Sequence, residues 1–165
     1  MKKIILSVAV LAVFFTGCKK KEDDPAPSQT QSKSKTELLT AHSWKFTGSV
    51  SNVAIDTDDD ASTPNTKDLY NEWSLDCEKD DIYTFSANNT GTINDAGTVC
   101  DPNGSITFTW VLSGNTLVLS TGTGANTYVE TMTLVSIDDN TLKVNYAEDE
   151  DPNGVKYIQT DTYTK

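Results

Sequence analysis

The sequence predicts an all-β fold, an eight-stranded antiparallel up-and-down barrel. From Thr36 onward, apolar and polar residues alternate over about eight short segments, as in strands with one buried face. Turns rich in Gly, Asn and Asp join these segments, and no amphipathic helix separates them, which excludes a parallel βαβ sheet. Closing such a meander into a barrel removes its unpaired edges. A β-sandwich is the alternative.

The elements follow one another in a simple order. A short helix over residues 36–42 leads into the first strand, and a long acidic loop over 56–69 is followed by a helical turn within 69–76. Asp-Pro-Asn-Gly occurs at 101–104 and at 151–154, and both copies predict type I turns with glycine at positive φ. The strands are expected at residues 43–50, 81–85, 92–95, 106–112, 117–119, 128–137, 142–146 and 155–163.

The alternation also predicts which side chains point inward. Trp44, Phe46 and Val50 share one face of the first strand. In the strand over 128–137, Met132 and Leu134 lie on one face. The other face of that strand carries Val129, Val135 and Ile137.

The N-terminal segment predicts export and lipidation. Residues 1–17 have a basic start, an apolar run of about a dozen residues and a small-residue end, the layout of a signal peptide. Cys18 directly afterwards resembles the lipidated cysteine of bacterial lipoproteins, which implies a palmitate-bearing anchor. Residues 18–35 are polar and predict a disordered tether. Within it, residues 21–24 resemble the signal that places Bacteroidota lipoproteins on the outer face of the outer membrane, so we expect that location.

The charge of the folded part limits its partners. From Thr36 onward the chain has 6 lysines, no arginine and 21 Asp and Glu, a net charge of −15. Nucleic acid is excluded as a partner, because neutralising phosphates requires clustered cations. Calcium or a cationic ligand is permitted, although acidic residues also simply keep an exported domain soluble.

Two cysteines remain once Cys18 carries lipid. Cys77 and Cys100 allow one pairing, and an exported protein meets an oxidising compartment. We therefore predict a Cys77–Cys100 disulfide. Metal binding by this pair is not expected, because the one histidine, His42, is distant in sequence.

No catalytic or metal site is predicted. His42 has no recognisable nucleophile motif near it, and the acidic runs 56–60 and 148–151 are interpreted as solvated loops, with no cofactor. Trp73 is expected to tuck over the end of the barrel, and the alternative is an exposed aromatic side chain that stacks on a sugar or a partner. Aromatic residues of the apolar face could line a ligand pocket or simply fill the interior, and these alternatives stay open. The candidate ligand-binding residues are Trp44, Phe46, Tyr83, Phe85, Phe108, Trp110 and Tyr146.

Several segments together resemble the lipocalin-like domain of Bacteroidota lipoproteins. They are Leu38-Leu39 before Trp44, residues 80–85 after Cys77, then Cys100, residues 110–117 and the C-terminal 162–165. The resemblance covers residues 36–165 and implies an eight-stranded barrel, a disulfide and a calyx for a small apolar ligand. The chain departs from true lipocalins because His42-Ser43-Trp44 lacks the glycine of their first-strand motif, and no arginine exists to cover Trp44.

The sequence therefore predicts a lipid-anchored, monomeric binding protein of the cell envelope that is not an enzyme. It would capture a small apolar or glycan-derived ligand, and an open calyx above about 300 Å³ would favour that function. The alternative is an accessory protein of a surface complex, with a filled barrel and no small-molecule ligand.

Overall fold

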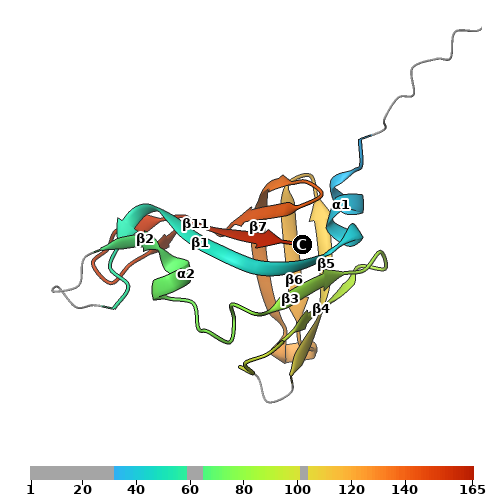
Figure 1. Ribbon diagram of the computed structural model, residues 1–165, viewed down its shortest axis with the longest axis horizontal. Coiled ribbons are helices and arrows are strands. Elements are labelled where there is room, and N and C mark those ends of the chain that lie inside the picture. Colours follow the sequence, from blue (N-terminus) through green and yellow to red (C-terminus); the bar gives the residue numbers. More distant parts are fainter. Residues whose placement is uncertain (1–31, 59–64, 101–103) are drawn as a thin grey trace, which may run out of the picture. The chain divides into compact units, whose positions relative to one another are not determined.

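The computed structural model describes residues 32–58, 65–100 and 104–165, and the folded domain spans Lys33–Lys165 (Figure 1). The predicted signal peptide, Cys18 and the tether up to residue 31 lie outside the described residues, as does most of the turn at 101–104. Within the described ranges, no helix is long and apolar enough to cross a membrane.

Eight antiparallel strands close into a barrel. Each pairs with the next along the chain, and the last pairs with the first, so no edge is left open. This confirms the predicted up-and-down barrel and excludes the sandwich. The barrel strands are β1 (Ser43–Ile55), β3 (Ile82–Phe85), β4 (Thr90–Asn94), β5 (Ser105–Ser113), β6 (Thr116–Thr121), β7 (Tyr128–Ile137), β8 (Thr141–Asn145) and β11 (Gln159–Thr164).

Helix α1 (Lys35–Ala41) covers one end of the barrel. The Ser34 hydroxyl accepts the N–H of Glu37 at 3.2 Å, and the Glu37 carboxylate accepts the N–H of Ser34 at 2.6 Å, which makes a capping box. Lys35 Nζ donates to Asn115 Oδ1 in the β5–β6 turn and fixes the helix there. The predicted helix over 36–42 is confirmed, with its start at Lys35 instead of Thr36.

Strand direction defines the opposite end, which we call the mouth. Because β1 begins beside α1 and its neighbours run antiparallel, the turns after β3, β5 and β7 also lie at the α1 end. The connections β1–β3, β4–β5, β6–β7 and β8–β11 therefore lie at the mouth, and their described residues are 56–58, 65–81, 95–100, 104, 122–127 and 146–158. The last but one contains a short 3-10 helix, η1 (Gly124–Asn126).

Two register shifts correct the predicted faces. Between Phe46 and Gly48 the pairing of β1 with β11 shifts by a residue, so Ser49 is buried and Val50 is 49 % exposed. A second shift, between Leu134 and Ser136, turns Ile137 toward the core. The predictions for Val50 and Ile137 were wrong because an extra residue in one strand reverses the alternation beyond it.

Beyond the barrel, the far half of β1 builds a small satellite core. It packs Ile55 against Leu69 of α2 (Leu69–Glu72) and against Tyr157, and β1 also pairs with β2 (Thr66–Asp68). A separate hairpin joins β9 (Asp149–Glu150) to β10 (Lys156–Tyr157). The expected single strand over 155–163 is therefore divided, since residues 156–157 pair with β9 and β11 starts at Gln159.

Two acidic segments meet in this satellite. Asp151 accepts the backbone N–H of Asp56 at 3.0 Å, and the Asn153 side chain donates to Asp56 Oδ2 at 2.7 Å. Both carboxylates are buried, so Asp56 and Asp151 are structural, unlike the solvated loop residues that we expected. The turn predicted at 151–154 is confirmed: the N–H of Gly154 donates to the carbonyl of Asp151 at 2.9 Å, and Gly154 has φ +80°.

Gly91 is required because Phe108 lies across it. The two residues are paired between β4 and β5, and a Cβ on Gly91 would lie 2.3 Å from the Phe108 ring and 2.6 Å from the carbonyl oxygen of Thr84. We expect Gly91→Ala to lower the free energy of unfolding by about 1–3 kcal/mol, since the ring must shift. Gly48→Ala is the control, because its Cβ would meet only Thr162 at 3.8 Å. Equal denaturation midpoints for the two variants would contradict the expectation.

Candidate functional site

The barrel encloses a cavity of about 210 Å³, which we call the calyx. Its wall reaches from Phe85, Leu117 and Leu142, near the α1 ends of β3, β6 and β8, to Ile106 and Tyr128, at the mouth ends of β5 and β7. The side chains of Ile106 and Tyr128 are partly open to solvent. The calyx therefore opens at the mouth and is closed toward α1. The lining residues are Tyr83, Phe85, Ile93, Ile106, Phe108, Leu117, Leu119, Thr121, Tyr128, Glu130, Met132, Leu142, Val144, Tyr146 and Tyr163.

The predicted ligand-binding aromatics divide into two groups. Tyr83, Phe85, Phe108 and Tyr146 line the calyx. Trp44, Phe46 and Trp110 do not line it, although all three belong to the same buried core.

Trp110 packs against Phe85, which lines the calyx. Their ring centroids lie 5.7 Å apart, edge to face, and Phe85 meets Phe108 in the same way at 5.3 Å. The Trp110 indole N–H is shared between the carbonyls of Thr90, at 3.0 Å, and Ser86, at 3.2 Å. These two hydrogen bonds hold the Trp110 indole at the β3–β4 turn, so Trp110 does not line the calyx.

Trp44 and Phe46 are held by other contacts. Trp44 is fully buried and donates to the carbonyl of Leu39 in α1 at 2.9 Å. Phe46 packs between Tyr163 and Tyr70 of α2, at centroid distances of 5.6 and 5.1 Å. Trp73, which we expected over the barrel end, is 48 % exposed and lies 6.2 Å from Tyr157 in the satellite.

Among the residues that line the calyx, Glu130 is the one with a carboxyl group. Glu130 precedes Met132 and Leu134 on the inward face of β7, and burial raises the pKa of its carboxyl, with a further contribution from the charge of Asp161. Asp161 is itself buried on β11 and accepts hydrogen bonds from Gln159 at 2.9 Å and the Tyr163 hydroxyl at 3.5 Å. Burial outweighs these hydrogen bonds, and the pKa of Asp161 is raised.

Three tyrosines surround these carboxyl groups. Tyr83, Tyr146 and Tyr163 line the calyx, and the rings of Tyr83 and Tyr163 meet edge to face at 5.2 Å. Burial raises the pKa of each phenol, and the charge of Asp161 adds to the effect. We did not single out Glu130, Asp161 or Tyr163 from the sequence. The alternation could have identified the two acidic residues. Glu130 lies two positions before inward-facing Met132, and Asp161 lies two positions before inward-facing Tyr163.

His42 lies at the other end of the barrel. Its ring centroid is 5.8 Å from that of Trp44, and Nε2 is 3.6 Å from Asp139 in the turn after β7. This turn is at the α1 end, so His42 is remote from the calyx.

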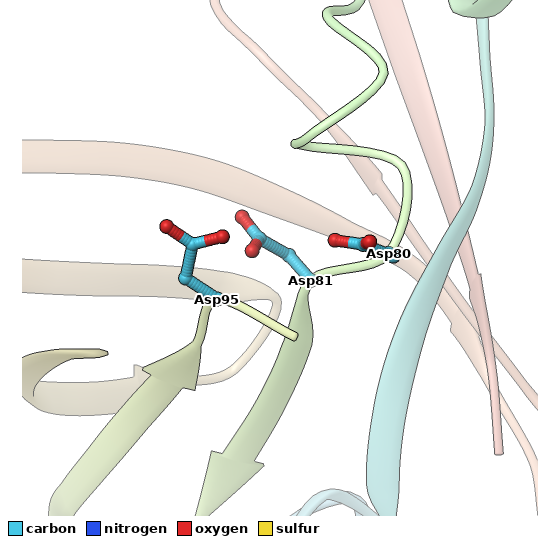
Figure 2. Close-up of side chains that lie close together, drawn as sticks. All are labelled: Asp80, Asp81 and Asp95. Atoms are coloured by element: carbon cyan, nitrogen blue, oxygen red, sulfur yellow. The ribbon is translucent and has the colours of Figure 1, made fainter. Parts of the chain in front are cut away.

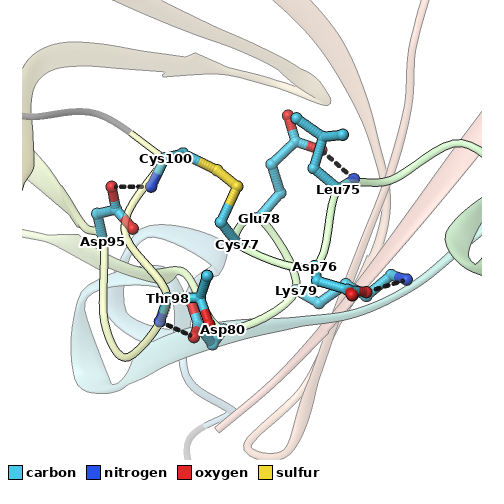
Figure 3. Close-up of a disulfide and its surroundings, with 9 residues drawn as sticks. All are labelled: Leu75, Asp76, Cys77, Glu78, Lys79, Asp80, Asp95, Thr98 and Cys100. Carbon is cyan, nitrogen blue, oxygen red and sulfur yellow. Dashed lines mark hydrogen bonds and ion pairs between the residues drawn. A yellow bond between two sulfur atoms is a disulfide. The ribbon is translucent and has the colours of Figure 1, made fainter.

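The predicted disulfide is confirmed at the mouth (Figure 3). Cys77 and Cys100 are bonded, with their Cα atoms 5.3 Å apart, and join the segment before β3 to the loop after β4. Two aspartates support the joined loops: Asp80 accepts the N–H of Thr98 and Asp95 accepts the N–H of Cys100, both at 2.8 Å. The bridge and these hydrogen bonds fix the 95–100 segment beside the mouth.

Asp80, Asp81 and Asp95 form an acidic cluster next to this bridge (Figure 2). One carboxylate oxygen from each lies within 4.8 Å of the others, an arrangement of the oxygen ligands that divalent cations accept. Asp80 and Asp95 also accept the backbone N–H groups of the 98–100 loop described above. Burial, reinforced by the charges of Asp95, Asp80 and Glu78, raises the pKa of Asp81 to about 6.

The pKa of Asp81 makes stability depend on pH. The folded-state pKa lies above the ordinary value of 3.8, so folding favours the protonated form and stability decreases as the pH rises from about 4 to about 6. We expect Asp81→Asn to raise the free energy of unfolding at pH 7 by about 1 kcal/mol. The gain is small because Asp81 is only partly buried, and solvent screens its interactions with the neighbouring charges. The gain should vanish below pH 4. Urea denaturation at both pH values measures it, with exposed Asp76→Asn as the control; a gain that persists at low pH would contradict this account.

A comparison with curated proteins finds no match to the chain. A comparison with protein families does find a match, and it agrees with the barrel architecture. The family model for the lipocalin-like domain matches residues 40–144, well over half of the chain. The match runs from the end of α1 through β8, which is seven of the eight barrel strands, and β11 completes the closure around the calyx. Both the closed meander and the matched residues therefore show that this chain belongs to the family of lipocalin-like domains.

Proposed function

We propose that the protein binds a small, largely apolar molecule in the calyx. The observation that carries the proposal is the cavity of about 210 Å³, closed toward α1, open at the mouth and lined mainly by aromatic and aliphatic side chains. Small-molecule sites have this character, mostly apolar with a few polar groups that orient the ligand.

The size of the calyx limits the ligand. The volume of about 210 Å³ is below the roughly 300 Å³ at which drug-sized pockets begin. A closed apolar cavity of about 150 Å³ already binds benzene. The calyx thus suits a molecule with one aromatic ring and a short substituent, or one such end of a longer ligand. The calyx is smaller than the roughly 300 Å³ that would favour ligand capture, and the barrel is not filled as the accessory-protein alternative requires. The binding test below separates the two functions.

Blocking the calyx tests the proposal. Leu119→Trp would place an indole in the cavity, whereas Val111→Trp adds the same side chain at an outward position of β5 that is already 58 % exposed. We expect calorimetric binding of 2-phenylethanol to the full chain and to Val111→Trp, and none to Leu119→Trp. Absence of binding to the full chain, or equal binding by both variants, would overturn the proposal. Native mass spectrometry of protein purified from its host would identify the natural ligand.

We further propose that a lipid anchor holds this barrel at the cell envelope, as in lipoproteins of Bacteroidota. Two observations support this anchor. Residues 1–17 resemble a signal peptide and directly precede Cys18, and the bond between Cys77 and Cys100 leaves Cys18 as the one cysteine outside the disulfide. The polar segment after Cys18 precedes a domain that begins at the Ser34 cap. Residues 21–24 support placement on the outer face of the outer membrane.

Lipidation has a direct test. We expect palmitate and glycerol labels to enter the wild-type chain in its host and Cys18→Ser to lose them, because only Cys18 offers a thiol outside the disulfide. A Cys18→Ser chain that is still labelled would contradict lipidation at this residue. Protease added to intact cells should digest the wild-type domain; a domain digested only after lysis would place it inside.

A further inference from the structure

The calyx contains a charge that the protein itself leaves without a counter-ion. Glu130 lines the cavity, and within the described residues no lysine forms an ion pair with Glu130 or with Asp161. No lysine lines the calyx either, and the chain has no arginine. Taking a carboxylate out of water without a cation beside it costs free energy, so the partly buried Glu130 favours a partner that brings positive charge.

Building on the proposed function, we propose that the calyx binds a small organic cation, an amine carried on an apolar or aromatic body. The ammonium group would donate to the Glu130 carboxylate near the mouth, with Asp161 reinforcing the negative potential from β11. The apolar body would lie against Phe85, Phe108 and Leu119 farther inside.

The tyrosines suit the same ligand. Tyr83, Tyr146 and Tyr163 line the cavity, where a ring face attracts a cation and a phenol oxygen accepts a hydrogen bond from it. Their raised pKa values keep all three neutral across the physiological range, so they add no competing charge. An anionic ligand of equal size would instead meet repulsion from both carboxylates. The net charge of −15 from Thr36 onward acts in the same direction.

Three probes of similar size separate charge from shape. They are 2-phenylethylamine, which is a cation at pH 7, neutral 2-phenylethanol and anionic phenylacetate, each titrated calorimetrically into the full chain. We expect the amine to bind about tenfold more tightly than the alcohol, since a hydrogen bond between charged groups contributes more than a neutral one. Phenylacetate should bind least. Equal affinities for amine and alcohol, or a preference for phenylacetate, would overturn the inference.

Substitution of Glu130 tests the contact itself. Glu130→Gln keeps the side-chain shape and removes the charge, so the affinity for the amine should fall about tenfold while that for the alcohol stays unchanged. Glu72→Gln, at an exposed position of α2, is the matched control and should change neither affinity. Unchanged amine binding by Glu130→Gln, or equal losses for amine and alcohol, would refute the role of Glu130. If neither amine nor alcohol binds the wild-type chain, the proposed function fails together with this inference.

The pH dependence gives a readout that needs no variant. Glu130 on β7 lines the calyx and Asp161 on β11 lies next to it, and the pKa values of both carboxyl groups are raised. Burial keeps Tyr83, Tyr146 and Tyr163 from titrating in the same range. The amine stays protonated below about pH 10, as lysine does. Its affinity relative to the alcohol should therefore decrease as the pH falls through the raised pKa of Glu130. A ratio that stays constant between pH 8 and pH 4 would overturn the inference.

Discussion

Replacing Trp44 by alanine should lower the free energy of unfolding by about 3–5 kcal/mol, the cost of removing a large aromatic side chain from a packed core. Trp44 is fully buried and is the largest such side chain of the barrel. Its indole donates to the carbonyl of Leu39 at 2.9 Å, so the substitution also leaves a helix carbonyl without its donor and disconnects α1 from β1.

Urea denaturation of the full chain measures this effect. Trp73→Ala is the matched control, because Trp73 is 48 % exposed and contacts only the satellite residue Tyr157 among the aromatic rings described. It should cost about 1 kcal/mol or less. Trp44→Phe should fall between the two, since it keeps the packing and loses the hydrogen bond. If Trp44→Ala costs no more than Trp73→Ala, α1 does not depend on Trp44 for its place on the barrel.

Removing the disulfide should cost about 3 kcal/mol, the chain-entropy estimate for a loop of this length. The sequence separation of Cys77 and Cys100 is 23 residues. The double variant Cys77→Ser with Cys100→Ser avoids a free thiol at the mouth. Its loss should be concentrated in the loops that the bridge joins, because the 95–100 segment then keeps its hydrogen bonds to Asp80 and Asp95 but loses its covalent link to residue 77.

Reductant provides the control for the bridge. Denaturation of the wild-type chain in dithiothreitol should reproduce the double variant, and the double variant itself should not respond. Hydrogen exchange should show faster exchange at the N–H of Thr98 and of residue 100 in the double variant, while β5 to β8 keep their protection. Equal denaturation midpoints for wild type and variant would contradict a stabilising role for the bridge.

The barrel was predictable because its signal is local. Alternating residues define each strand, and the turn at 138–140 supplies its own hydrogen bonds, with Asp138 accepting the N–H groups of Asn140 and Thr141 at 2.7 and 2.8 Å. Once short turns join antiparallel strands, closure follows from the cost of open edges. The errors at Val50 and Ile137 arose at bulges, which depend on the neighbouring strand.

The site was only partly predictable. Tyr83, Phe85, Phe108 and Tyr146 share the inward face with Trp44, Phe46 and Trp110, and nothing in the alternation separates them. What separates them is the neighbour that each side chain meets. Trp44 donates to Leu39 of α1, Phe46 packs on Tyr70 of α2 and Trp110 donates to the β3–β4 turn, whereas the other four line the cavity.

The sequence by itself determined the strand order and the barrel, because short turns join strands that are neighbours in the chain. It also determined the disulfide pairing and the absence of arginine, because both follow from composition. Only the tertiary structure decided that the barrel is hollow, that Asp56 and Asp151 are buried together, and that Glu130 shares the calyx with three tyrosines. Cavity volume depends on how side chains from different strands meet. A carboxylate becomes costly only when the fold takes water away from it.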